Sequence, residues 1–304
     1  MKLDRIVIGM DFSDTALKGA KWASRFFAPS AEVTLVHVVD RPHDPAFGRH
    51  LVPPPDVIEA QACEYAATRL HDVASFLSDA PPRFEIRVGK PYEQVTTLAR
   101  ELDADLIVIG PHGDRPRPSK FLGTTAERIV RTSPVPVLVA TNPPAGPPRT
   151  LLVPVDDLSI TPTLLDWTRD LAEAFDASVT LLHVWSNAVY GHVASMSYAT
   201  AGSEGEARRD INRELHDAGV HWLEEIARAG LERRRVSAAV TYGHPGDVTV
   251  ATAASMHADL IVLGRRGSGL VAPALLGSTV GAVLHGAACP VLVVTEAGER
   301  VETI

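Results

Sequence analysis

Two glycine-rich segments hold the residues whose types and spacing could bind a phosphate. Residues 110–125 and 264–279 both read Gly-x-x-Gly, nine residues, then Gly followed by serine or threonine. Glycine lets backbone amides come close to a ligand, and a helix that opens with Gly-Ser or Gly-Thr adds free N–H groups and the positive end of its dipole. We interpret the segments as anion-binding loops. The alternative is that each glycine serves only a turn or a close contact between a helix and a sheet.

The two segments belong to an internal repeat that covers the chain. Residues 105–110 return as residues 259–264, at an offset of 154, whereas His37 returns as His183, at an offset of 146. The second copy must therefore hold eight additional residues between these landmarks. We place the insertion in the Ser/Gly/Ala-rich stretch 195–205, because exposed loops tolerate added length at little cost.

The repeat predicts two similar domains. We expect the first to span residues 1–141 and the second residues 149–304, and a length of 304 residues is typical of two domains. Residues 142–148, which lie between them, are rich in proline and predict a semi-rigid linker.

Within each copy, short apolar strands alternate with amphipathic helices. The opening strands, residues 5–10 and 151–155, each lead to an aspartate, and Ser13 is the expected N-cap of the helix that follows in the first copy. Apolar strands alternating with helices are typical of a parallel sheet covered on both faces. We therefore expect a doubly wound α/β fold that binds its ligand beyond the carboxyl ends of the strands.

Composition narrows the choice of partners. The chain has a formal net charge of −8 and a pI near 5.8, which argues against a general binder of nucleic acid or of anionic membranes. Its two cysteines, Cys63 and Cys289, form neither a disulfide framework nor a zinc motif. The N-terminus lacks the apolar run of a signal peptide, and no apolar run approaches the ~20 residues that span a bilayer. We expect a cytoplasmic protein.

These residues and their spacing resemble the universal stress protein family, in its ATP-binding branch, over the whole of each half. The resemblance implies two tandem Rossmann-like domains, each with a five-stranded parallel sheet and ATP at its carboxyl end. It also implies self-association through the apolar fifth strands, residues 135–140 and 290–295, within the chain or as a homodimer. The implied function is that of a stress-response regulatory protein.

The resemblance also implies the residues that bind the nucleotide. Contacts to phosphates and ribose would come from Gly110, Gly113, Gly123, Thr124 and Thr125 in the first copy. In the second copy they would come from Gly264, Gly267, Gly277, Ser278 and Thr279. The aspartates after the opening strands, Asp11 and Asp156, would lie against the nucleotide or its Mg²⁺. Backbone contacts to adenine would come from Val38 and Val184.

The first glycine loop departs from the family pattern. It carries an acid and two prolines between its glycines, Asp114, Pro116 and Pro118. Each proline lacks an amide donor, and the carboxylate repels phosphate, although three bases could offset this: Arg115, Arg117 and Lys120. We therefore expect the second domain to bind nucleotide more tightly.

Plainer interpretations stay open for several of these residues. Asp11 and Asp156 could cap the following helices. His37 and His183 lie within apolar strands and are expected to be packed core residues rather than metal ligands. Trp22 recurs as Trp167 at an offset of 145, so both are expected to pack on equivalent helices.

Other functions also stay open. An ATP pyrophosphatase or nucleotidyltransferase on a related fold would need Ser-Gly-Gly-x-Asp-Ser or His-x-Gly-His, and the chain has neither; it also lacks a Walker A lysine. Slow ATP hydrolysis and a nucleotide-free dimeric interaction protein are the remaining alternatives.

Overall fold

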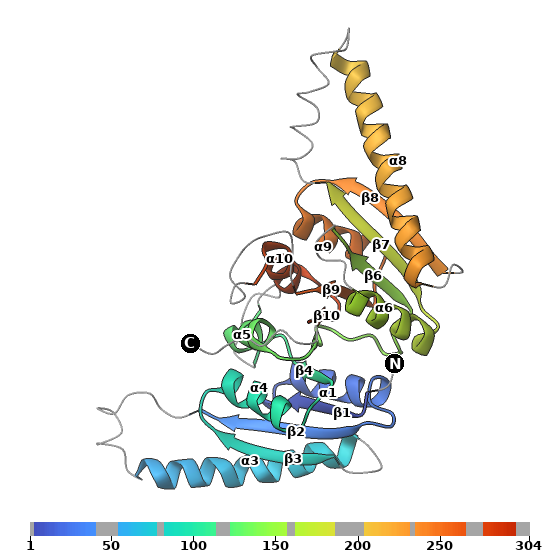
Figure 1. Ribbon diagram of the computed structural model, residues 1–304. Helices are drawn as coiled ribbons and strands as arrows, with labels where there is room; N and C mark the ends of the chain where they lie inside the picture. The colour runs from blue at the N-terminus through green and yellow to red at the C-terminus, as the bar shows by residue number, and fades with distance from the viewer. Residues whose placement is uncertain are drawn as a thin grey trace. The chain divides into compact units, whose positions relative to one another are not determined.

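The computed structural model describes residues 3–40, 54–77, 82–113, 122–156, 162–185, 204–231, 235–265 and 276–295. The chain divides into two compact units, Lys2–Ala145 and Gly146–Val294, and each is an α/β domain (Figure 1).

The first domain is a parallel five-stranded sheet in the order β3-β2-β1-β4-β5. In β1, Val7 pairs with Thr34 of β2 on one side and with Ile107 of β4 on the other. The elements are β1 (Arg5–Gly9), α1 (Asp14–Phe26), β2 (Glu32–Val39), α3 (Pro55–Leu77), β3 (Arg83–Val88), α4 (Pro91–Glu101), β4 (Leu106–Ile109), α5 (Thr124–Thr132) and β5 (Val137–Val139).

The second domain repeats this topology, with strand order β8-β7-β6-β9-β10 and parallel pairing throughout. Its elements are β6 (Thr150–Pro154), α6 (Pro162–Phe175), β7 (Ser178–Trp185), α8 (Glu204–Gly230), β8 (Val236–Tyr242), α9 (Pro245–Ser255), β9 (Leu260–Gly264), α10 (Ser278–Gly286) and β10 (Val291–Val294). The predicted doubly wound fold is confirmed in both halves.

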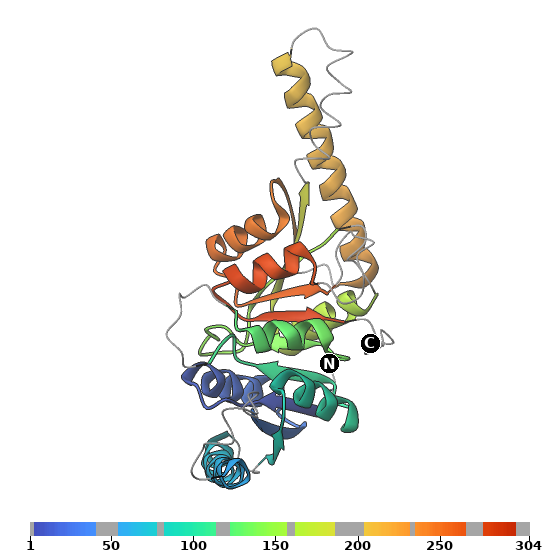
Figure 2. The same cartoon turned by 90° about the vertical axis from the view of Figure 1, so that its left-hand side faces the viewer.

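Helices cover both faces of each sheet. In the first domain α1 and α3 pack on one face and α4 and α5 on the other; α3, in light blue, is seen almost end-on in Figure 2. In the second domain α6 and α8 form one layer, and α9 and α10 form the other. The central strands are accordingly buried: Leu106 and Ile107 of β4 and Leu260 and Ile261 of β9 are all 0% exposed. This explains why these strands are continuously apolar rather than alternating.

One aspartate in each domain ties the first strand to the fourth. Asp105, just before β4, accepts hydrogen bonds from the backbone N–H groups of residues 4 and 5, at 2.7 and 2.9 Å. Asp259, just before β9, does the same for residues 149 and 150, at 2.8 and 3.0 Å. The carboxylates satisfy amides at the amino edge of the sheet, opposite the edge where a ligand is expected.

The first helices of the two domains correspond at a different offset from the one we expected. Their buried residues match at an offset of 148: Ala16, Ala20, Ala23 and Phe27 in the first domain, and Leu164, Thr168, Leu171 and Phe175 in the second. The helix α6 begins six residues after Asp156, whereas α1 begins three residues after Asp11. The predicted equivalence of Trp22 and Trp167 is therefore wrong. The additional residues before α6 shift its sequence by three positions relative to α1, so the two tryptophans lie at different positions on the equivalent helices.

Among the residues that the structure describes, no helix is both long and apolar enough to cross a bilayer.

Candidate functional site

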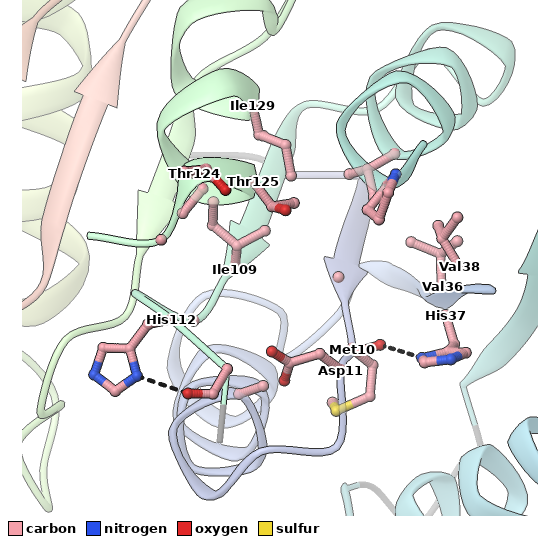
Figure 3. A pocket seen from close by; sticks show the side chains of 18 of the residues that line it. Met10, Asp11, Val36, His37, Val38, Ile109, His112, Thr124, Thr125 and Ile129 are labelled. Carbon is pink, nitrogen blue, oxygen red and sulfur yellow. Dashed lines mark hydrogen bonds between the residues drawn. The ribbon is translucent and has the colours of Figure 1, made fainter. Parts of the chain in front are cut away.

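A cavity of ≈490 Å³ lies at the carboxyl edge of the first-domain sheet. Its wall is formed by residues of β1, β2 and β4 and of α1, α4 and α5. The wall includes all seven residues that we proposed for the first nucleotide site: Asp11, Val38, Gly110, Gly113, Gly123, Thr124 and Thr125. Figure 3 shows Thr124 and Thr125 on one side of this space and Asp11 on another. Segments separated by about a hundred residues thus meet around one cavity.

Two glycines of the motif stand where a side chain would collide. A Cβ on Gly110 would lie 3.1 Å from the backbone nitrogen of Ala16 and 3.2 Å from its Cα. A Cβ on Gly113 would lie 3.0 Å from Oδ2 of Asp11. The loop after β4 therefore passes close to the start of α1 and to the aspartate after β1, and Gly110 and Gly113 both line the cavity.

The two oxygens of Asp11 have different roles. Oδ1 accepts hydrogen bonds from the backbone N–H and the hydroxyl of Ser13, at 3.0 and 2.6 Å. The predicted N-cap, Ser13, in turn accepts a hydrogen bond from the N–H of Ala16 at 3.2 Å. Asp11 thus supports the cap without being the cap. Its Oδ2 faces Gly113, on the side where the cavity lies.

The start of α5 offers backbone donors to the cavity. Gly123 is the N-cap, with extended backbone angles, and no side chain accepts a hydrogen bond from the first turn. The N–H of Gly123 itself donates to the carbonyl of Pro111 at 2.7 Å, which fixes the loop at this point. The first amides of a helix have no acceptor within the helix, so those of Thr124 and Thr125 remain for a ligand.

The strand-two histidines are structural in both domains. Nδ1 of His37 donates to the carbonyl of Met10 at 2.7 Å (Figure 3), and Nδ1 of His183 donates to the carbonyl of Val155 at 3.0 Å. Each imidazole therefore holds the end of strand one against the end of strand two. This agrees with their interpretation as packed residues, although His37 also lines the cavity.

The described part of the second domain places the corresponding residues at the corresponding ends. Asp156 follows β6, Val184 is the penultimate residue of β7, and Gly264 ends β9. Gly277 is the N-cap of α10, with ψ 146° as in Gly123, and Ser278 and Thr279 open that helix. Gly267 belongs to residues 266–275, which lie outside the described residues, as do Asp114, Arg115, Pro116, Arg117, Pro118 and Lys120 of the first loop.

Comparison with known proteins identifies the family. The profile of the Universal stress protein family matches residues 2–141 and 148–295. The chain belongs to this family. The universal stress protein Rv2623 of Mycobacterium tuberculosis is 25% identical over 305 residues, which cover 96% of both chains.

Solved universal stress proteins share the fold. The crystal structure of a universal stress protein from Archaeoglobus fulgidus covers 97% of this chain and 97% of its own, with a TM-score of 0.68 and 19% identity. A universal stress protein crystallised in complex with cAMP is 19% identical and covers 49% of this chain and 98% of its own, with a TM-score of 0.32.

The cavity wall of this universal stress protein is acidic where it is described. Among the described residues that line it, the carboxylates are Asp11 and Asp40, and none is lysine or arginine. We did not single out Asp40 from the sequence, although its position directly after β2 was a usable signal. In this part of the wall, phosphate binding would therefore depend on amides, hydroxyls and the dipole of α5.

The described residues form no metal centre of their own. No group of three or more His, Cys, Asp or Glu side chains among them is placed to hold a metal ion. A single carboxylate such as Asp11 is a weak Mg²⁺ site, because Mg²⁺ in nucleotide sites is held by one or two carboxylates together with phosphates and water.

Proposed function

We propose that this universal stress protein binds an adenine nucleotide in the first-domain cavity and acts as a stress-response regulatory protein. The observation that carries the proposal is the convergence of the seven motif residues on one cavity, whose ≈490 Å³ lies within the range of small-molecule sites. We propose the equivalent site, around Gly264, Gly267, Gly277, Ser278 and Thr279, for the second domain.

The residues of the first domain fit the parts of a nucleotide. The amides and hydroxyls of Thr124 and Thr125 are donors for phosphate at a helix N-terminus. The backbone of Val38, at the end of β2, would meet the base, and Oδ2 of Asp11 would meet the ribose or a phosphate-bound Mg²⁺. The space that a Cβ on Gly113 would fill lies beside that oxygen, at 3.0 Å.

The decisive test uses the purified full chain. Denaturing it and identifying released small molecules by mass spectrometry asks whether an adenine nucleotide is carried through purification. Calorimetric titration with ATP, ADP, AMP, cAMP and GTP then ranks the ligands. We expect adenine nucleotides to bind and GTP to bind more weakly. If the folded chain binds none of them at millimolar concentration, the proposal is wrong and the nucleotide-free interaction protein is favoured.

A separate incubation with ATP tests hydrolysis. Incubating the chain with ATP and following ADP formation separates a nucleotide-binding regulator from a slow ATPase. We propose binding without dedicated turnover, because the sequence motifs of ATP pyrophosphatases, nucleotidyltransferases and Walker A enzymes are missing from the chain.

Self-association through β5 and β10 remains our proposal. Both strands are short and fully apolar, and an open apolar edge invites pairing. Light scattering on the full chain, combined with cleavage at a protease site placed in residues 142–148, tests it. A monomer whose halves separate after cleavage would contradict pairing both between chains and within the chain. The free cysteines Cys63 and Cys289 favour a reducing compartment such as the cytoplasm.

A further inference from the structure

Four side chains lead from the wall of the first-domain cavity to the exposed side of α3. His37 lines the cavity, and the ring of Phe12 is stacked on it with centroids 4.6 Å apart. The guanidinium of Arg69, on α3, lies 4.8 Å from the centre of the Phe12 ring. Arg69 also donates a hydrogen bond of 2.7 Å to the hydroxyl of Tyr65, which is 60% exposed. We call His37, Phe12, Arg69 and Tyr65 the Phe12 stack.

The backbone of Phe12 is in an unfavourable conformation. Its φ is 64°, in the left-handed region that residues with a Cβ rarely adopt. Phe12 lies between Asp11, which lines the cavity, and Ser13, which caps α1. Backbone strain of this kind persists where the surrounding structure enforces it, and it gathers at functional sites. Here it places the phenyl ring between the strand-two histidine and α3.

The stack holds His37 on a second side. The imidazole already donates to the carbonyl of Met10 at 2.7 Å, and Phe12 packs on its ring plane at an interplanar angle of 30°. The next residue, Val38, is the proposed backbone contact to the base. Phe12, Arg69 and Tyr65 are not part of the cavity wall, nor is any other described residue of α3.

In the second domain the equivalent helix, α8, contacts the strand-two histidine through a different side chain. At an offset of 153, the buried residues Ala66 and Leu70 of α3 correspond to the buried residues Gly219 and Leu223 of α8. At the same offset, the position of Arg69 in the first domain is equivalent to that of Trp222 in the second. The Trp222 ring lies 5.1 Å from that of His183, at an interplanar angle of 76°. Thus the residue at this helix position contacts the histidine in both domains: Arg69 contacts His37 through the Phe12 ring, and Trp222 contacts His183 directly.

We propose that Phe12 and Arg69 are positioning residues of the first nucleotide site, so that its affinity is set from α3, a helix that does not line the cavity. The inference rests on the proposed function. Removing Arg69 frees the Phe12 ring and loosens the end of β2 that would meet the base. Because coupling between two sites is reciprocal, a bound nucleotide should in turn stabilise α3 around Arg69.

The test compares two arginines that both lie over an aromatic ring. Arg69→Met removes the cation of the Phe12 stack, and Arg25→Met removes the cation over Phe26, 5.3 Å from its ring centre and outside the cavity wall. Both are made in the full chain carrying Gly277→Asp, so that the calorimetric titration with ATP reports the first domain. We expect Arg69→Met to weaken ATP binding about three- to thirtyfold, and Arg25→Met to change it less than about twofold.

Further measurements separate positioning from simple loss of stability. Arg69→Lys keeps a cation over the ring and should restore most of the affinity. Hydrogen exchange of residues 62–72 should slow when ATP is added to the parent and should respond less in Arg69→Met. If Arg69→Met does not fold, Tyr65→Phe, which removes only the hydroxyl bonded to Arg69, decides the question through a smaller loss of affinity.

The outcomes distinguish this inference from the proposed function. If the parent binds no nucleotide, both fail. If the parent binds ATP and Arg69→Met binds it equally well, or if Arg25→Met loses as much affinity as Arg69→Met, the proposed function stands and the positioning role is overturned.

Discussion

The helices α5 and α10, whose N-caps are Gly123 and Gly277, pack on the neighbouring helix in different ways: one through long side chains and the other through close backbone approach. At an offset of 154, Tyr92 and Arg128 of the first domain correspond to Gly246 and Ala282 of the second. The guanidinium of Arg128 lies 5.0 Å from the centre of the Tyr92 ring, between α4 and α5. In the second domain α9 and α10 come so close that a Cβ on Gly246 would lie 2.4 Å from that of Ala282.

This difference shows how one topology can support a site by two packing solutions. The arginine and tyrosine side chains form a polar contact that holds α5, while backbone proximity fixes α10. The close approach continues to the end of α10, where a Cβ on Gly286 would lie 2.9 Å from Val250. We therefore expect the second domain to be the less tolerant of added volume around α10. Two experiments test this contrast, and a third tests the contrast between the two glycine loops.

The largest expected effect concerns the two cysteines, one in each domain. Cys289 follows α10, and burial raises the pKa of its thiol from 9.0 to about 12, with a smaller contribution from Asp259. At pH 8 its thiolate fraction is therefore roughly a thousandfold below that of a thiol with an unshifted pKa. Both side chains are partly exposed, so the raised pKa of Cys289 decides the order: labelling with a thiol reagent, followed by peptide mapping, should modify Cys63 long before Cys289. Equal rates in the native chain would contradict the raised pKa of Cys289; equal rates in denaturant are the control.

The second prediction exchanges the contact itself. Gly246→Tyr places a large side chain where even a Cβ is too close, so we expect the second domain to lose about 3 kcal/mol in its free energy of unfolding. The matched change Tyr92→Gly should cost the first domain about 1 kcal/mol, since it removes a surface cation–π pair and adds a helix glycine. Urea denaturation measures both. Adding Ala282→Arg to Gly246→Tyr tests whether the first-domain pair can be transplanted; a second domain that accepts Gly246→Tyr alone would refute the contrast.

The smallest expected effect is the asymmetry of nucleotide binding. The first loop carries two prolines and an acid, and the described wall of its cavity holds no lysine or arginine, so its phosphates would have fewer donors. Losing one charge-assisted hydrogen bond, at ~1.5–3 kcal/mol, weakens binding about tenfold or more. Calorimetry on Gly277→Asp and Gly123→Asp should therefore show that Gly277→Asp removes the tighter site. The reverse result would mean that Arg115, Arg117 and Lys120 of the first loop make up for its missing amide donors.

Local patterns in the sequence predicted much of what surrounds the site. The continuous apolar strands, the N-cap at Ser13 and the glycine positions are each decided within a few residues, because hydrogen-bonding periodicity and steric demands act locally. The internal repeat then extended these predictions from one half to the other. The universal stress protein fold was therefore readable from the chain, as were the residues that converge on the first cavity.

Matching single residues between the repeats did not predict the offset of 148 that relates α1 to α6. The repeat aligned Trp22 with Trp167 by identity, but burial aligns the helices three residues further along. Three additional residues before the buried helix positions are followed by two fewer after them, since Asp11 matches Asp156 at an offset of 145, the buried helix residues match at 148 and His37 matches His183 at 146. Which face of a helix is buried depends on its packing against the sheet, and a sequence match of single residues does not report that.

The sequence by itself determined the two α/β domains with parallel sheets and the glycine positions from which we proposed the nucleotide sites. Only the tertiary structure brought Asp40 into the cavity wall, set Arg69 over Phe12 and made Tyr92 and Gly246 alternative solutions to one contact. The physical reason is the sequence distance over which each interaction acts. Helix periodicity, caps and glycine sterics act over a few residues, whereas stacking and close approach join side chains that are tens of residues apart and form only when the helices pack on the sheet.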